Sequence, residues 1–214
     1  MFLGLSKSFA PSEKKTAYIE NEKIFSNYFY GAPISILLID SFKTGFLIKT
    51  YFQKYKVVHG FKHPETIIVR TSKSFWRKNL NNKGMSLFRR DERENKESIV
   101  PMPPGTLYLG DPAYGRWRTD DSGGSYWKFH RAYRHFPRIF NWGDFRPTKS
   151  FYNSLKIYLS HENSFYGLNK EFGSKGSVIL ENLKDESLQA EMQAIDYIKH
   201  IDNYFNIPPW KKEK

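Results

Sequence analysis

The sequence predicts an α+β fold, in which a mainly antiparallel sheet from the central hairpins is flanked by N-terminal and C-terminal helices. Near both ends of the chain, apolar residues recur every three or four positions, which is the spacing of the buried face of a helix. The middle instead has short apolar runs separated by turns rich in Gly, Asn and Asp, a pattern typical of strands and hairpins. Helices placed around a strand-rich middle indicate the α+β class.

The N-terminal third is predicted to be helical. A first helix is capped by Ser12, carries apolar residues at helical spacing up to Phe29, and ends at Gly31. Over 34–55 the apolar residues recur mostly every three or four positions, which predicts a helix buried on more than one side. A pair of strands broken at Thr44-Gly45 is the alternative for the same stretch.

The middle of the chain is predicted to hold the strands. A buried strand is expected over 66–70, and the turn 81–84 is expected to join 75–80 and 85–90 in a hairpin. The other elements predicted for this region are a strand over 106–109, a turn over 110–115, and a second hairpin that joins 116–119 to 125–133 across 120–124.

The last third returns to a helical pattern. Pro147 suits the first position of a helix whose apolar stripe includes Leu155. A short strand is expected over 177–180. The apolar spacing over 188–205 then predicts a C-terminal helix, which ends before two consecutive prolines.

The composition is that of one folded α+β domain, which we place at 12–209, between a flexible N-terminal segment 1–11 and a basic C-terminal tail 210–214. Of the 214 residues, 39% are hydrophobic and 26% are charged, and a chain of this length needs no disulfide or structural metal for stability. The absence of cysteine excludes cysteine nucleophiles, zinc-thiolate sites, iron-sulfur clusters and disulfide scaffolds. No apolar run reaches the roughly 18 to 20 residues that cross a bilayer, so no integral membrane segment is expected.

The chain carries a large excess of positive charge, with 34 Lys and Arg against 22 Asp and Glu, a net charge of +12. Such an excess attracts nucleic acid, an anionic membrane face, an acidic cell-wall polymer or an acidic protein. The charge is also uneven, because 70–96 holds nine cations and three acids, whereas 181–206 holds six acids and two lysines. We therefore expect partner proteins with acidic surfaces, including further copies of the chain in a head-to-tail contact.

The densest binding signal lies over 114–149, where eight Lys and Arg face three acids and are interleaved with ten aromatic residues. Arg offers a planar fork for carboxylates and stacks on aromatic rings, and both residue types are enriched where proteins bind one another. The residues predicted to contact a partner protein are Arg116, Trp117, Arg118, Trp127, Arg131, Tyr133 and Arg134. Because strand side chains alternate, only a subset of these is expected to be exposed together. The alternative is that most of the aromatics form the core.

Familiar catalytic motifs are absent, including G-x-S-x-G, G-x-G-x-x-G, the P-loop and H-E-x-x-H. His59 and His63 have the spacing of two metal ligands on a helix, but Gly60 and Pro64 favour a loop, so no metal site is predicted. We therefore predict a non-enzymatic structural or binding protein with no catalytic residue and no cofactor.

Two other function classes remain open. His130 and His135 lie near Asp120 and Asp121 in the sequence, and such a group could serve a hydrolase of an envelope polymer such as the cell wall, although no nucleophile stands at a recognisable spacing. The net charge also suits a nucleic-acid-binding protein, although no RNA-binding motif, helix-turn-helix or zinc module is visible.

Two stretches, 107–118 (LYLGDPAYGRWR) and 126–135 (YWKFHRAYRH), lie within a sequence rich in Lys, Asn, Phe and Tyr and resemble spirochaete envelope proteins. Among these, they are similar to the flagellar-coiling and sheath proteins that coat periplasmic flagella. The resemblance implies a non-enzymatic coat subunit of the periplasm or cell envelope, which takes part in motility and binds other filament proteins. An export signal would then have been removed from the mature chain, and a cytoplasmic location is the alternative.

Overall fold

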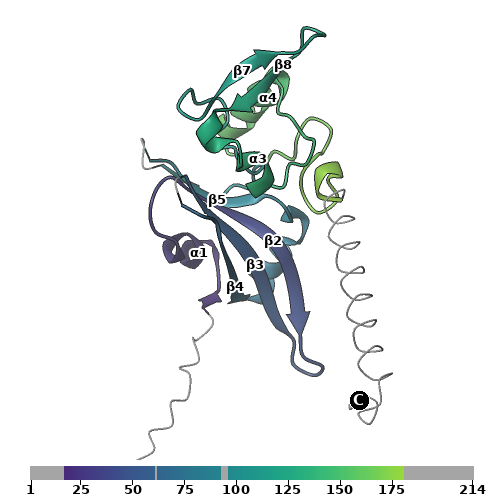
Figure 1. Cartoon of the computed structure of the whole chain (residues 1–214). Coiled ribbons are helices and arrows are strands. Elements are labelled where there is room, and N and C mark those ends of the chain that lie inside the picture. The colour runs from purple at the N-terminus through teal and green to yellow at the C-terminus, as the bar shows by residue number, and fades with distance from the viewer. Residues whose placement is uncertain (1–16, 61, 93–95, 181–214) are drawn as a thin grey trace, which may run out of the picture.

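A computed structural model describes residues 17–60, 62–92 and 96–180, which form two β-sheets and several short helices (Figure 1). The larger sheet has six strands in the order β1-β4-β3-β2-β5-β6, and the smaller sheet consists of β7 and β8. All pairs are antiparallel except β1 with β4. The mixture of helix and sheet and the mainly antiparallel pairing confirm the sequence prediction at that level.

The strands are β1 (Tyr18–Ile19), β2 (Ile34–Thr44), β3 (Thr50–His59), β4 (Glu65–Thr71), β5 (Ser86–Arg90), β6 (Glu97–Ser98), β7 (Gly115–Thr119) and β8 (Ser125–Phe129). The labelled α-helices are α1 (Glu22–Tyr28), α2 (Lys73–Lys78), α3 (Phe136–Ile139) and α4 (Lys149–Ser160), and residues 177–180 are also helical. Two short 3₁₀ helices are η1 (Leu80–Asn82) and η2 (Arg131–Tyr133). No helix within the described ranges has the length and apolar character that a membrane crossing requires.

The stretch 34–55, predicted as a helix, is instead the hairpin of β2 and β3, which was the alternative. Its apolar spacing resembled that of a helix because a register shift between Leu38 and Asp40 moves the following side chains to the other face of the sheet. The first five residues of β2 are all buried and so show no alternation. The chain turns at Gly45, whose φ is +90° and whose added Cβ would lie 2.0 Å from the Ile48 carbonyl oxygen.

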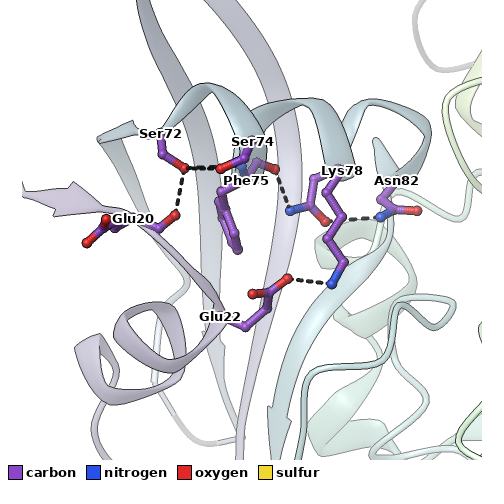
Figure 2. Close-up of polar contacts among 8 residues, drawn as sticks. Glu20, Glu22, Ser72, Ser74, Phe75, Lys78 and Asn82 are labelled. Carbon is purple, nitrogen blue, oxygen red and sulfur yellow. Dashed lines mark hydrogen bonds and ion pairs between the residues drawn. The ribbon is translucent and has the colours of Figure 1, made fainter.

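The strand predicted over 66–70 is confirmed as β4, but the hairpin predicted after it is only half right. Its second arm is strand β5, whereas its first arm is helix α2. Ser72 caps α2 by accepting a hydrogen bond from the backbone N–H three residues later at 3.1 Å. Figure 2 shows how α2 is tied to the N-terminal segment, since Ser72 also donates to the Glu20 carbonyl at 2.6 Å and Lys78 pairs with Glu22.

The N-terminal helix is shorter than predicted. It begins at Glu22 and not at Ser12, because Asn21 caps it by accepting from the Ile24 N–H at 3.0 Å, and the residues just before it form β1. The predicted segments that lie outside the described residues are 1–11, the C-terminal helix over 188–205 and the tail 210–214.

In the second half of the chain, the turn before β7, the hairpin of β7 and β8, and the helix after Pro147 are confirmed. The strand predicted over 106–109 is a turn instead, in which the Tyr108 N–H donates back to the carbonyl of Gly105 at 2.9 Å. The strand predicted over 177–180 is helical, since backbone N–H groups there donate to carbonyls three and four residues earlier.

Other elements pack against both faces of the large sheet. On one face, Phe25 of α1 packs against Tyr55 of β3 and Phe75 of α2, with ring centroids 5.1 and 5.3 Å apart. The second half of the chain covers part of the opposite face, where Lys56 Nζ donates to the Ile139 carbonyl at 3.0 Å and to the Asn141 side chain at 3.1 Å. Buried residues from both halves form one continuous hydrophobic cluster.

Aromatic residues make up most of the core of the second half. Tyr108 packs against Phe136 and Phe140, and Phe129 packs against Phe136 and Trp142, with centroids 4.8 to 5.8 Å apart. The high aromatic content of 114–149 therefore serves packing to a large extent, which was the alternative to recognition.

Candidate functional site

The hairpin of β7 and β8 separates its side chains into two faces. The register pairs Trp117 with Trp127 and Arg116 with Lys128. The two tryptophan rings lie 5.2 Å apart, and Trp117 also lies 5.4 Å from Tyr152 of α4, so the aromatic face turns toward the rest of the protein. The cationic side chains of the alternate positions are exposed.

The seven residues predicted to contact a partner are divided by the fold. Four arginines are exposed: Arg116, Arg118, Arg131 and Arg134. Trp117 and Tyr133 are half-buried, and Tyr133 packs against Tyr114 and Phe136. Trp127 is only 5% exposed and packs against Trp117, so little of its ring is available on the surface of the hairpin. β8 ends at Phe129, earlier than predicted, which places Arg131 and Arg134 in and after η2.

A cleft of about 280 Å³ opens beside β8, and three cations line it: Lys128, Arg134 and Arg146. We call it the basic cleft. The other lining residues are Tyr126, Trp127, Phe129, Pro137, Trp142, Gly143, Phe145 and Pro147. No carboxylate is among the lining residues, so the three positive charges are not neutralised within the wall.

Backbone and side-chain hydrogen bonds fix the walls of the basic cleft. The Trp127 N–H donates to the Pro147 carbonyl at 2.8 Å, which joins β8 to the segment before α4. Trp142 Nε1 donates to the Pro104 carbonyl at 3.1 Å, which holds the floor. The guanidinium carbon of Arg146 lies 5.7 Å from the centroid of the Tyr126 ring, in cation–π range. These contacts connect the walls and the floor of the cleft to one another.

This arrangement is suited to anion binding. Guanidinium groups hold carboxylate or phosphate oxygens in charge-assisted hydrogen bonds, and the aromatic floor offers apolar contact beside them. The partner-binding residues predicted from the sequence include Arg134 but not Lys128 or Arg146. The one sequence signal for these two residues is that they lie in the same cation-rich stretch, 114–149. Their place in the cleft could not be predicted, because the contact between Arg146 and Tyr126 joins residues twenty positions apart.

In the described part of the chain, no hydrogen bond or ion pair joins the two histidines of the hydrolase alternative to Asp120 or Asp121. His130 Nε2 lies 3.0 Å from the Pro112 carbonyl oxygen, and His135 packs edge-on against Phe136. Asp120 instead closes the hairpin loop, where it accepts from the Ser122 hydroxyl at 2.7 Å and from backbone N–H groups. These hydrogen bonds, the one from Ser122 foremost, lower the pKa of the Asp120 carboxyl. Among the described residues, no three His, Asp or Glu side chains gather as metal ligands.

A comparison with protein families, curated proteins and solved structures finds no match to this chain.

Proposed function

We propose that the protein is a non-enzymatic binding protein that holds an acidic segment of a partner protein in the basic cleft. The observation that carries this proposal is the presence of Lys128, Arg134 and Arg146 around an aromatic floor, with no carboxylate in the lining. Opposite charges favour close approach of an acidic chain, and the desolvated rings add contact area.

The size and surroundings of the cleft support a protein segment as the ligand. A volume of about 280 Å³ accommodates a few side chains of a partner. Arg116 and Arg118 on β7 are paired with the cleft-lining Lys128 and Tyr126 of β8, and both arginines are exposed. Arg131 in η2 is exposed as well, so these arginines add positive charge around the hairpin. A segment with several spaced carboxylates would engage both the cleft and these arginines.

The resemblance to flagellar-coiling and sheath proteins gives the proposal a particular setting. In that setting, the chain is an envelope or periplasmic coat subunit, and its partners are other subunits of the filament. The sequence 181–206, with six acids and two lysines, would supply one such acidic segment from a second copy. The C-terminal helix predicted over 188–205 belongs to this proposal.

The test is a titration of the full chain against a fluorescent peptide of Glu-Tyr repeats, followed by anisotropy. Changing Arg134→Gln and Arg146→Gln together should weaken binding by about 30-fold, which corresponds to about 2 kcal/mol from lost anchors. The matched control, Lys73→Gln with Arg77→Gln on α2, removes the same net charge from exposed positions and should change affinity by about threefold at most.

Two outcomes would overturn the proposal. Equal losses in the two double variants would mean that only net charge attracts the peptide. The other outcome is that a single-stranded DNA oligonucleotide binds more tightly than the peptide and loses affinity steeply as the salt concentration rises. This result would favour the nucleic-acid-binding alternative.

A further inference from the structure

The hairpin of β2 and β3 ends in three consecutive apolar residues that are almost fully exposed. Phe46 is 95% exposed, Leu47 is 90% and Ile48 is 84%, and we call them the apolar tip. Single exposed apolar residues are ordinary on a protein surface, whereas adjacent ones indicate a binding surface. In Figure 1 the hairpin extends beyond the rest of the large sheet, and its loop forms that end of the described molecule.

Positive charge surrounds the apolar tip. Between Asp40 and Glu65 the sequence contains five lysines and no acid. Two of these, Lys43 and Lys49, are exposed on either side of the tip. The tip therefore combines an apolar end with a cationic margin and has no carboxylate in the hairpin beyond Asp40.

The stem beneath the tip is ordered by aromatic contacts on both faces. Phe42 stacks on Phe52 with centroids 5.4 Å apart, and Tyr51 packs against Trp76 of α2 at 5.2 Å on the other face. The last strand pair joins Thr44 to Thr50, so only the five residues between them form the loop. The apolar side chains are consequently presented on a firm support.

We propose that the apolar tip inserts into the surface of an anionic lipid membrane. Its three side chains would enter the boundary between headgroups and acyl chains, while the flanking lysines contact anionic headgroups. A convex tip of three residues buries little area against a folded protein, where a stable contact needs roughly 1,000 Å² or more. A lipid surface deforms around such a point, and it supplies the negative charge that the lysines match.

This inference is independent of the basic cleft, and it is tested with the full chain and lipid vesicles in a sedimentation assay. Vesicles with about 30% phosphatidylglycerol in phosphatidylcholine should bind the protein, and pure phosphatidylcholine should bind it at least about tenfold less. The triple variant Phe46→Ser, Leu47→Ser, Ile48→Ser should lose binding to the anionic vesicles by about tenfold or more.

A control variant and a spectroscopic readout accompany the assay. Ile157→Ser with Leu168→Ser removes exposed apolar residues elsewhere and should leave vesicle binding within about twofold. In a Leu47→Trp variant, tryptophan emission should shift to shorter wavelength when anionic vesicles are added. Thermal melts should show that every variant is folded.

Three results would overturn the inference. One is undiminished vesicle binding by the triple serine variant, and another is an unshifted emission in the Leu47→Trp variant. The third is a chain that ignores vesicles but sediments as a dimer until the tip is changed, because the tip would then be a contact between copies of the protein.

Discussion

Gly105 occupies a position where both the backbone and the neighbouring rings exclude a side chain. Its φ is +84°, and an added Cβ would lie 2.7 Å from the Trp142 ring and 2.9 Å from the Phe140 ring. Both rings belong to the aromatic core beneath the basic cleft. The tight approach therefore links a loop glycine to the floor of the candidate site.

We expect Gly105→Ala to lower the free energy of unfolding by about 2 to 4 kcal/mol, through strain at positive φ together with overpacking. Gly123→Ala is the matched control, because its φ is +85° and no atom lies within 4 Å of its added Cβ. That variant should lose only about 1 kcal/mol, from backbone strain alone. Urea denaturation measures both. Equal losses would show that the rings move aside without cost.

His59, at the end of β3, provides a prediction about pH. Burial lowers the pKa of the His59 imidazole, Lys62 lowers it further, and Glu65 partly opposes them. Because the folded state disfavours the protonated ring, stability is complete above the unfolded pKa of about 6.5 and is lost as the pH falls through the lower folded pKa. The urea concentration at the denaturation midpoint should therefore decrease as the pH is lowered from about 7.5 to about 5.5.

The His59→Gln variant should show a smaller drop over the same pH range than the unmodified chain. Changing the exposed His63 to Gln provides the control and should leave the drop as it is. If the two variants lose stability in parallel with the unmodified chain, the pH effect belongs to other groups.

At the scale of secondary structure, elements with strong local signals could be predicted from the sequence. The hairpin of β7 and β8 has a loop that Asp120 closes by itself, and α4 has an apolar stripe on one side. The hairpin of β2 and β3 could not be predicted in this way, because burial on both faces and the shift after Leu38 remove its alternation. Those features depend on what packs against the strands.

Helix α4 carries a prediction of its own. Leu155 is fully buried, whereas Ile157 on the same helix is 58% exposed. Leu155→Ala should therefore cost about 2 to 5 kcal/mol of unfolding free energy, from lost burial and the cavity left behind. Ile157→Ala should cost about 0.5 kcal/mol or less. Thermal melts of the two variants should differ clearly, and matching midpoints would contradict the packing of this helix.

At the scale of the whole molecule, the hairpin of β7 and β8 and the loop that joins β2 to β3 lie at opposite ends of the described structure (Figure 1). The first hairpin contributes residues to the basic cleft, and the loop carries the apolar tip. Net charge could be read from the sequence, but its separation into these two places could not. Lys128 and Arg146 line the same cleft because β8 pairs with the segment before α4. Phe46 and its neighbours lie in the stretch predicted as a buried helix, whereas the structure places them in the exposed loop of the hairpin of β2 and β3.

The two proposals together predict that one molecule joins an acidic peptide to an anionic membrane. The full chain should carry the fluorescent Glu-Tyr peptide into the pellet with anionic vesicles, because the two sites are far enough apart to be filled at once. The cleft double variant should sediment without peptide, and the tip triple variant should bind peptide without sedimenting. A mixture of these two variants should not recruit the peptide, and recruitment by the mixture would contradict bridging by a single molecule.

The aromatic lining of the cleft also allows binding in the cleft to be followed by the intrinsic fluorescence of the protein. Trp127 and Trp142 line the cleft. Trp117, on the same hairpin as Trp127, has Lys149 Nζ at 4.3 Å from the centroid of its ring. An occupant that changes the polarity of the cleft would change indole emission there, without any attached dye. Trp76 packs against Tyr51 in the other half of the molecule and supplies a constant background to that signal.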